Sequence, residues 1–356
     1  MRIAGIFRGF PGLGRVVSGT EILSSLKHQG AEVKLFTYMQ GSEYVESLGY
    51  STSYDVRNTD ISSIGIIPVS NYGEIILNQL RDFNPEFVLI DGEPLMLTSL
   101  KISLPNIKIV ALLNPYDVVN PHNQWSSNLF FQHAYSMSDL AIVHGLYRIE
   151  KPKSYNTFIS TNTIIRQQVL QIKDRSPVDK VSCILGGGSV NVTPDFQDAT
   201  VRIADMCINL AHSLRSFEHH IYCGDRATYE KVSILNWPNN MILHDSIANC
   251  ETYFLDSKLI IARAGRNVAS ELLYLGIPAI LVPTNASHRS DEQRSNTAIL
   301  QRLSEDRISS LEIGSSEHYF AEMANRLVSL SDVERISWCP GNDEAISSIL
   351  ALLDRK

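Results

Sequence analysis

The stretch 257–296 constrains the fold of this chain more than any other. It opens with SKLIIAR, an apolar run of strand length that small turn residues follow. Asn267 can cap the helix expected next, and Gly276 and Pro278 are suited to end it. The run AILV then predicts a second buried strand of the kind found in parallel sheets. A strand, a helix and a second strand in this order are typical of doubly wound α/β proteins.

Glu271 lies in the first turns of that expected helix. A carboxylate that follows a strand can accept hydrogen bonds from both hydroxyls of a ribose, as acidic residues do in other nucleotide-binding α/β folds. The same residue can instead serve only to complement the helix dipole. The residue type alone leaves both interpretations open.

The pattern of strand, small-residue loop and helix begins twice more in the chain. A strand over 2–7 precedes a loop with three glycines and a helix over 16–29. A strand over 180–185 precedes the loop GGGS at 186–189 and a helix over about 195–214. The second loop can cradle a phosphate with its N–H groups, whereas a tight turn explains the first loop equally well. We therefore predict an α/β chain with two Rossmann-like domains and a cleft between them.

The expected domain boundaries follow from these repeated units. We place an N-terminal domain at 1–165 and a C-terminal domain at 166–340. The segment 151–178 carries two prolines and a charged run, and we expect it to cross between the domains. A helix over 341–356 ends the chain and can cross back to the N-terminal domain.

Composition excludes several classes of protein. The net charge of −7 over 356 residues argues against non-specific nucleic-acid binding, which needs a basic face. The five cysteines are scattered without a C-x-x-C pair, which favours reduced thiols in a cytoplasmic protein over a zinc site or a disulfide framework. No apolar run approaches the length of a membrane span. Peripheral membrane contact stays open, because the run LFF at 129–131 can either pack in the core or contact lipid.

Polar side chains follow the strands expected in the N-terminal domain. Asp91 and Glu93 come directly after the strand at 87–90, and Asp117 and His122 follow the strand at 108–113. Open α/β sheets bind ligands at the carboxyl ends of their strands, so these residues can line a cleft. The alternative for Asp117 is a turn-forming role beside the prolines.

Several motifs together resemble one known family. They are ARAG at 262–265, ELL at 271–273, LGIPAILVP at 275–283, DEQ at 291–293 and Asn296. The set resembles the C-terminal domain of MurG-like (family 28) glycosyltransferases, which implies the GT-B fold and inverting transfer of a sugar from a nucleotide diphosphate donor. The similarity is specific over about 180–300, weaker over the first forty residues, and nearly absent over 40–150, where the acceptor normally binds.

The resemblance also implies roles for the residues of a donor site. Glu271 would bind the ribose hydroxyls, and Arg166 would pair with the donor phosphate. The diphosphate would be held by the two small-residue turns, through Gly187, Gly188, Ser189, Ala264 and Gly265.

Three further residues complete the implied donor site. The backbone of His244 would contact the base, commonly uracil in this family. Glu292 and Gln293 would contact hydroxyls of the donor sugar. Ser290 and Gln293 also match a capping box, so part of this signal can be structural.

The sequence departs from the family in two places. Arg15 stands where the family usually has a histidine at the end of the N-terminal loop, and Asn191 replaces the last glycine of the second loop. Because an arginine stays protonated, Arg15 cannot act as a general base, although it can neutralise a leaving diphosphate. The base must lie elsewhere on the N-terminal side, with four candidates: Asp91, Glu93, Asp117 and His122.

These features together predict an inverting, metal-independent glycosyltransferase. We expect it to move a sugar from a UDP-sugar such as UDP-GlcNAc to the hydroxyl of a small-molecule or oligosaccharide acceptor, without a further cofactor. The absence of an Asp-x-Asp motif agrees with a donor that no metal holds. Two alternatives remain, a nucleotide-sugar hydrolase or 2-epimerase of the same fold and a non-catalytic sugar-nucleotide-binding subunit. The sequence leaves the oligomeric state open.

Overall fold

The chain forms two compact units in the computed structural model. The first comprises Met1–Ile165 and Pro340–Lys356, and the second comprises Arg166–Cys339. The structure describes residues 1–9, 12–52, 71–121, 123–186, 194–245, 249–284, 290–304, 306–330 and 336–354. Within these ranges no helix is both long enough and apolar enough to cross a membrane.

Unit 1 is built on a six-stranded sheet whose described pairings are all parallel. The strands lie in the order β2-β1-β3-β4-β5-β6. Their apolar runs are buried on both faces, as helix-covered parallel strands require. The strands are β1 (Arg2–Phe7), β2 (Glu32–Phe36), β3 (Phe87–Asp91), β4 (Lys108–Leu113), β5 (Leu140–Gly145) and β6 (Phe158–Asn162).

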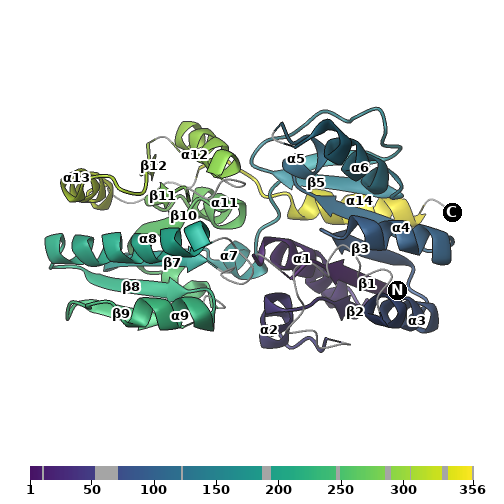
Figure 1. Cartoon of the computed structure of the whole chain (residues 1–356), viewed down its shortest axis with the longest axis horizontal. Coiled ribbons are helices and arrows are strands. Elements are labelled where there is room, and N and C mark those ends of the chain that lie inside the picture. Colours follow the sequence, from purple (N-terminus) through teal and green to yellow (C-terminus); the bar gives the residue numbers. More distant parts are fainter. Residues whose placement is uncertain are drawn as a thin grey trace. The chain divides into compact units, whose positions relative to one another are not determined.

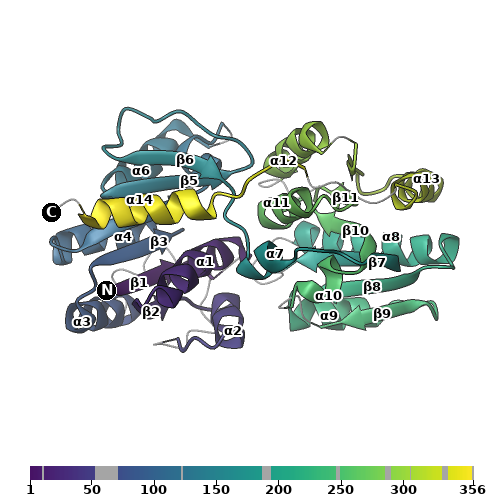
Figure 2. The same cartoon turned by 180° about the vertical axis from the view of Figure 1, so that it is seen from behind.

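Helices cover both faces of this sheet (Figures 1 and 2). Helices α1 and α14 lie on one face, while α4 and α6 lie on the other. The last helix of the chain, yellow in Figure 2, therefore belongs to unit 1 and buries Ala345 and Ile349 in the same core as β1. The helices are α1 (Gly14–His28), α2 (Gln40–Ser47), α3 (Asn71–Phe83), α4 (Pro94–Ser103), α5 (Pro115–Val118), α6 (Trp125–Ser136) and α14 (Asn342–Asp354).

Unit 2 repeats the same layered design. Its parallel sheet has the order β12-β11-β10-β7-β8-β9. The strands are β7 (Val178–Gly186), β8 (Glu218–Cys223), β9 (Met241–His244), β10 (Ser257–Arg263), β11 (Ala279–Val282) and β12 (Ile308–Ser310). The helices are α7 (Gln167–Gln171), α8 (Pro194–Ser213), α9 (Arg226–Ser233), α10 (Glu251–Phe254), α11 (Arg266–Leu275), α12 (Ser290–Leu303) and α13 (Glu317–Val328).

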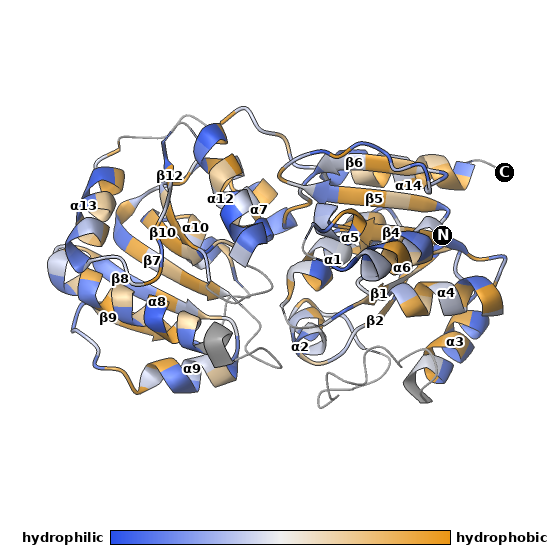
Figure 3. Ribbon diagram, turned by 45° about the horizontal axis from the view of Figure 1, so that its top comes forward, coloured by the Kyte–Doolittle hydropathy of each residue, from blue (hydrophilic) through white to orange (hydrophobic). Residues whose placement is uncertain are grey.

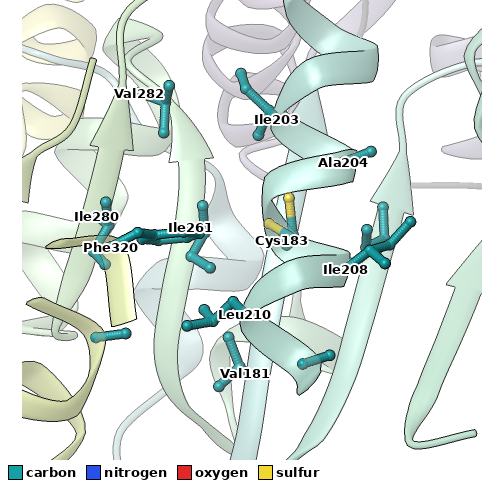
Figure 4. Close-up of a cluster of buried hydrophobic side chains, with 14 of the residues drawn as sticks. Val181, Cys183, Ile203, Ala204, Ile208, Leu210, Ile261, Ile280, Val282 and Phe320 are labelled. Carbon is teal, nitrogen blue, oxygen red and sulfur yellow. The ribbon is translucent and has the colours of Figure 1, made fainter. Parts of the chain in front are cut away.

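The core of unit 2 lies between the sheet and the helices α8 and α13 (Figure 4). Side chains such as Val181 and Ile261 from the strands meet Ile203 and Ile208 from α8, and Phe320 closes the cluster from α13. In the hydropathy colouring of Figure 3, β7 of this unit is orange, as is β5 of unit 1. Burial of such apolar strands against the helices is the dominant force that holds the layers together.

Each sheet has one point where the order of its strands reverses. In unit 1 this point lies between β1 and β3, and in unit 2 it lies between β7 and β10. The connections leave in opposite directions there, so the loops at the carboxyl ends diverge and leave room for a ligand. The functional residues are therefore expected after Phe7, Asp91, Gly186 and Arg263.

The stretch 257–296 folds as β10, α11 and β11, followed by the start of α12. Gly276 adopts the left-handed conformation (φ 65°) that ends α11. The cap expected at Asn267 is wrong: α11 begins at Arg266, and Gly265 takes the N-cap position without a side-chain cap. The expectation for the crossing segment 151–178 also lacked a strand, because this segment contains the edge strand β6.

Candidate functional site

A cluster of charged side chains marks the strand reversal of unit 1. Arg15, in the first turn of α1, forms an ion pair with Asp91 at the end of β3. Its guanidinium also contacts both oxygens of Asp117 in α5, at 2.7 and 3.0 Å. Burial alone would lower the pKa of Arg15, but Asp117 and Asp91 outweigh it and hold that pKa above its usual value. Arg15 is thus a fixed cation between two carboxylates.

Gly92 makes this arrangement possible. It has a positive φ of 83°, which side chains rarely adopt. A Cβ at this position would lie 2.6 Å from Cδ of Arg15 and 2.8 Å from Cβ of Arg8. The backbone between Asp91 and Glu93 therefore approaches the arginines more closely than any other residue would allow.

Glu93 forms a second contact group beside the first. It is the N-cap residue of α4, accepts a hydrogen bond from the Tyr38 hydroxyl, and lies 3.6 Å from Nε of Arg8. Burial raises the pKa of Glu93, and the neighbouring Arg8 and Tyr38 offset only part of that effect. Glu93 is consequently more easily protonated than an exposed glutamate.

The structure brings three of the four candidate bases together with Arg15. Asp91 and Glu93 are almost inaccessible, with side chains 1% and 2% exposed, whereas the Asp117 side chain is 15% exposed. Asp117 also forms a capping box with Asn114, so the turn-forming role expected as the alternative is present in addition to the ion pair. His122 lies outside the described residues.

The exposed side chains of α6 lie next to the segment that carries Asp117. Asn128 and Gln132 of α6 donate hydrogen bonds to the backbone of α5 and the residues that follow it. Leu129 and Phe130 are exposed, as is Trp125 at the start of the helix. Core packing, one expectation for this run, is therefore wrong for Leu129 and Phe130.

In unit 2 the expected ribose and phosphate ligands contact each other. Nε and Nη2 of Arg166 each lie 2.7 Å from one carboxylate oxygen of Glu271, and Nη1 donates to the Tyr253 hydroxyl at 2.9 Å. The guanidinium also lies 5.8 Å from the centres of the Tyr253 and Phe254 rings. Such a bidentate, ring-flanked arrangement is the strongest form of carboxylate–guanidinium pair. Both oxygens of Glu271 are engaged, so a ribose would have to share or replace Arg166 as the partner.

The burial of Glu271 shows that it does more than complement the helix dipole. It is the sixth residue of α11, past the first turn, and it is fully buried. The field of the helix dipole acts mainly within the first turn, so complementing the dipole cannot be its only role. A buried carboxylate is retained only where a specific partner compensates its desolvation, and Arg166 is that partner here.

His244 ends β9 with its ring turned into a stack of side chains. The ring lies parallel to Tyr222, with centroids 4.3 Å apart, and its Nε2 is 2.8 Å from Nδ1 of His220. Burial is the main cause that lowers the pKa of both histidines. Lys180 lowers it further in both and the His220 imidazole does so for His244, while Glu218 offsets part of the effect. The His244 side chain is thus committed to this stack, whereas the role implied by the resemblance concerns its backbone. Sequence reasoning missed His220 and Tyr222, which alternate along β8 and so face the same side.

The remaining donor-site candidates differ in how they are held. Ala264 is buried, whereas no atom of the described residues lies within 4 Å of a Cβ built on Gly265. Gln293 is buried in the first turns of α12, where its Oε1 accepts hydrogen bonds from the backbone and the hydroxyl of Thr284. Glu292 is partly exposed in the same turn. Since Ser290 is the first residue of α12, it does not occupy the N-cap position that the expected capping box requires.

Arg263, a cation at the strand reversal of unit 2, was not predicted as a site residue from the sequence. Arg263 ends β10, and its Nη2 lies 2.6 Å from the Cβ that a side chain at Gly186 would carry. Gly186 itself has a positive φ of 70°, and Nη1 of Arg263 contacts the Thr200 hydroxyl at 3.3 Å. An arginine directly after an apolar strand was the available signal. Gly187, Gly188 and Ser189 lie outside the described residues.

Comparison with protein families identifies the relatives of unit 2. Residues 184–310 match the model of the glycosyltransferase family 28 C-terminal domain. The resemblance to MurG-like glycosyltransferases is confirmed. A curated relative from Thermotoga neapolitana, a UDP-N-acetylglucosamine–N-acetylmuramyl-(pentapeptide) pyrophosphoryl-undecaprenol N-acetylglucosamine transferase, is 27% identical over 137 residues. That match covers 38% of this chain and 36% of the relative, so the chain matches about a third of the relative's length.

Comparison with solved structures extends the likeness to the whole chain. MurG from Acinetobacter baumannii aligns with a TM-score of 0.57 at 12% identity, over 100% of this chain and 99% of that one. UDP-GlcNAc 2-epimerase from Neisseria meningitidis, bound to UDP-GlcNAc, aligns with a TM-score of 0.62 at 16% identity, over 99% and 100%. Identities this low establish the fold and nothing finer. The chain has the GT-B fold.

Proposed function

We propose that this protein is a glycosyltransferase that moves a sugar from a nucleotide diphosphate donor, a UDP-sugar such as UDP-GlcNAc, to an acceptor hydroxyl. The observation that carries the proposal is the buried carboxylate of Glu271, held by Arg166 inside the domain that matches the family 28 model. A buried ionised pair at this position has no evident use in packing, since apolar residues of the same size would serve equally well. It is suited to recognition of a ribose hydroxyl pair and a phosphate.

Unit 2 would supply the donor-binding residues. Glu271 accepts the ribose hydroxyls, the backbone of His244 contacts the base, and Glu292 and Gln293 contact the sugar. Arg166 and Arg263 supply positive charge for the diphosphate, and the N–H groups of Gly187, Gly188 and Ser189 add to it. These groups stabilise the charge that develops on the leaving diphosphate, so no metal ion is needed for that step.

Unit 1 would supply the base. Inverting transfer requires a base that takes the proton of the acceptor hydroxyl while that oxygen attacks the anomeric carbon and the diphosphate leaves. Asp117 is the best placed of the described candidates, because it is the most exposed carboxylate of the cluster and Arg15 fixes its orientation. Arg15 pairs with Asp117, and buried Asp91 completes the ion-pair cluster.

Product analysis tests this proposal. The protein is incubated with UDP-sugars and a panel of small-molecule and oligosaccharide acceptors, with and without a chelator, and the products are examined by mass spectrometry and NMR. The expected result is release of UDP together with a glycoside of inverted anomeric configuration, unaffected by the chelator. A retained configuration, or turnover that the chelator abolishes, would contradict the mechanism.

A second function is favoured by one specific observation. The UDP-GlcNAc 2-epimerase of Neisseria meningitidis aligns with nearly the whole chain. An epimerase or a nucleotide-sugar hydrolase keeps the donor-binding residues but needs no acceptor. Incubation with the donor alone separates the two functions: conversion of the sugar at C2, or its hydrolysis at a rate that acceptors do not raise, would favour this alternative.

A further inference from the structure

The chain passes from unit 1 to unit 2 between two consecutive residues that are each held by buried polar contacts. Ile165 is the last residue of the first segment of unit 1, and Arg166 is the first residue of unit 2. The peptide group between them is planar and does not flex, so its carbonyl and its N–H keep a fixed relation. A contact that fixes the Ile165 carbonyl therefore also affects the position of the Arg166 N–H, and the reverse holds as well.

On the side of unit 1, Asn342 holds the backbone of Ile165. The Ile165 N–H donates to Oδ1 of Asn342 at 3.1 Å, and Nδ2 of Asn342 donates to the Ile165 carbonyl at 2.9 Å. Asn342 is buried at the start of α14, just after the chain has returned to unit 1. Next to it, the Gly341 N–H donates to the Thr163 carbonyl at 3.0 Å. Hydrogen bonds thus join the segment 163–165, which leaves unit 1, to the segment 341–342, which returns to it.

On the side of unit 2, Glu271 holds Arg166. Besides the two 2.7 Å contacts with the guanidinium, Oε1 of Glu271 lies 3.5 Å from the backbone nitrogen of Arg166 and accepts a weak hydrogen bond from it. The carbonyl of this peptide group is therefore bound to Asn342, and its N–H faces Glu271. Asn342 and Glu271 thus both contact the 165–166 peptide group.

We propose that Asn342 is a positioning residue for the donor site. By holding both backbone groups of Ile165, it fixes the orientation of the 165–166 peptide group and so the point from which the Arg166 side chain extends to Glu271. This inference rests on the proposed function for the identity of the ligand, since it assumes that Glu271 and Arg166 bind the nucleoside diphosphate. The contacts of Asn342 and the state of the donor site are then coupled through the 165–166 peptide.

Two substitutions at Asn342 separate this role from a general effect on α14. Asn342→Ala removes both hydrogen bonds to Ile165. Asn342→Asp keeps an acceptor for the Ile165 N–H, sets a carboxylate oxygen against the Ile165 carbonyl, and favours the helix N-terminus with its negative charge. Ser348→Ala, on an exposed turn of α14 where the hydroxyl bonds only the Glu344 carbonyl, is the matched control.

The first measurement is UDP affinity by isothermal titration calorimetry. We expect both Asn342 variants to bind UDP about tenfold more weakly, the effect of losing roughly one net hydrogen bond, and Ser348→Ala to bind it like the wild type. Arg166→Lys should also weaken binding. Because Asn342 acts through Arg166, adding Asn342→Ala to Arg166→Lys should change the affinity less than twofold. Full additivity of the two losses would overturn the inference.

The second measurement is hydrogen exchange, which needs no nucleotide. In Asn342→Asp the amides of 166–171, in unit 2, should exchange faster than in the wild type and in Ser348→Ala. If faster exchange is confined to 163–165 and 340–345, the proposed coupling is refuted even where UDP binds. Failure of the wild type to bind UDP would instead refute the proposed function, and the exchange result would still decide whether Asn342 acts across the crossing.

Discussion

Removal of one partner of the Arg166–Glu271 pair should destabilise unit 2 strongly. Arg166→Met deletes the guanidinium that contacts both oxygens of a fully buried carboxylate, and it also removes the hydrogen bond to the Tyr253 hydroxyl. An uncompensated buried charge of this kind costs about 3–5 kcal/mol. For a domain of this size each kcal/mol lowers Tm by about 2–4 °C, so we expect a decrease of roughly 6–20 °C for unit 2.

The assay is thermal and urea unfolding of Arg166→Met, Glu271→Leu and the double variant. The double variant removes both charges and should recover to within about 1 kcal/mol of the wild type, since a buried pair replaced by apolar side chains is often close to neutral. The loss in Arg166→Met should also shrink on acidification, because an unpaired buried carboxylate can then take up a proton. A loss below about 1 kcal/mol, or a double variant no more stable than Arg166→Met, would refute the reasoning.

Three further predictions concern the N-terminal cluster and the histidines. Gly92→Ala should displace Arg15 and lower the free energy of unfolding by about 1–3 kcal/mol, measured in urea; unchanged stability would show that the positive φ is not needed. Asp117→Asn should reduce kcat by at least about 100-fold with the fold retained by circular dichroism, and unchanged turnover would exclude it as the base. The lowered pKa values of His220 and His244 mean that the unfolded chain binds protons more readily below about pH 6.5, so Tm should fall from pH 7.5 to pH 5. His244→Gln should make that fall smaller, and an equal fall would assign the pH dependence to other groups.

The stretch 257–296 was predictable because each of its signals is local. Two continuous apolar runs of strand length, with Gly276 and a proline between them, allow one arrangement in an α/β protein, and β10, α11 and β11 follow it. The strand β6 was missed because Phe-Ile-Ser-Thr-Asn is half polar, as an edge strand can be, and lacks the apolar run of its neighbours. The start of α11 was misplaced by the presence of a good capping residue at Asn267, although the chain turns at Gly265.

The candidate site was predictable in outline and not in its pairings. The rule that ligands bind at the carboxyl ends of parallel strands brought Asp91, Glu93 and Asp117 to one edge. The structure shows Asp91 and Asp117 paired with Arg15, and Glu93 paired with Arg8 beside them. No local pattern indicates that Arg166 contacts Glu271, since 105 residues separate them along the chain. The pairing follows only from the packing of α11 against the start of unit 2. Long-range side-chain contacts of this kind require the fold before they can be inferred.

The proposed donor site is tested most directly by an experimental structure of the protein with UDP bound. We predict that both ribose hydroxyls lie within hydrogen-bonding distance of the Glu271 carboxylate, about 2.5–3.0 Å, and that Arg166 has left at least one of the two oxygens to contact the diphosphate. A structure in which UDP binds elsewhere, while Arg166 keeps both oxygens of Glu271, would contradict the central claim.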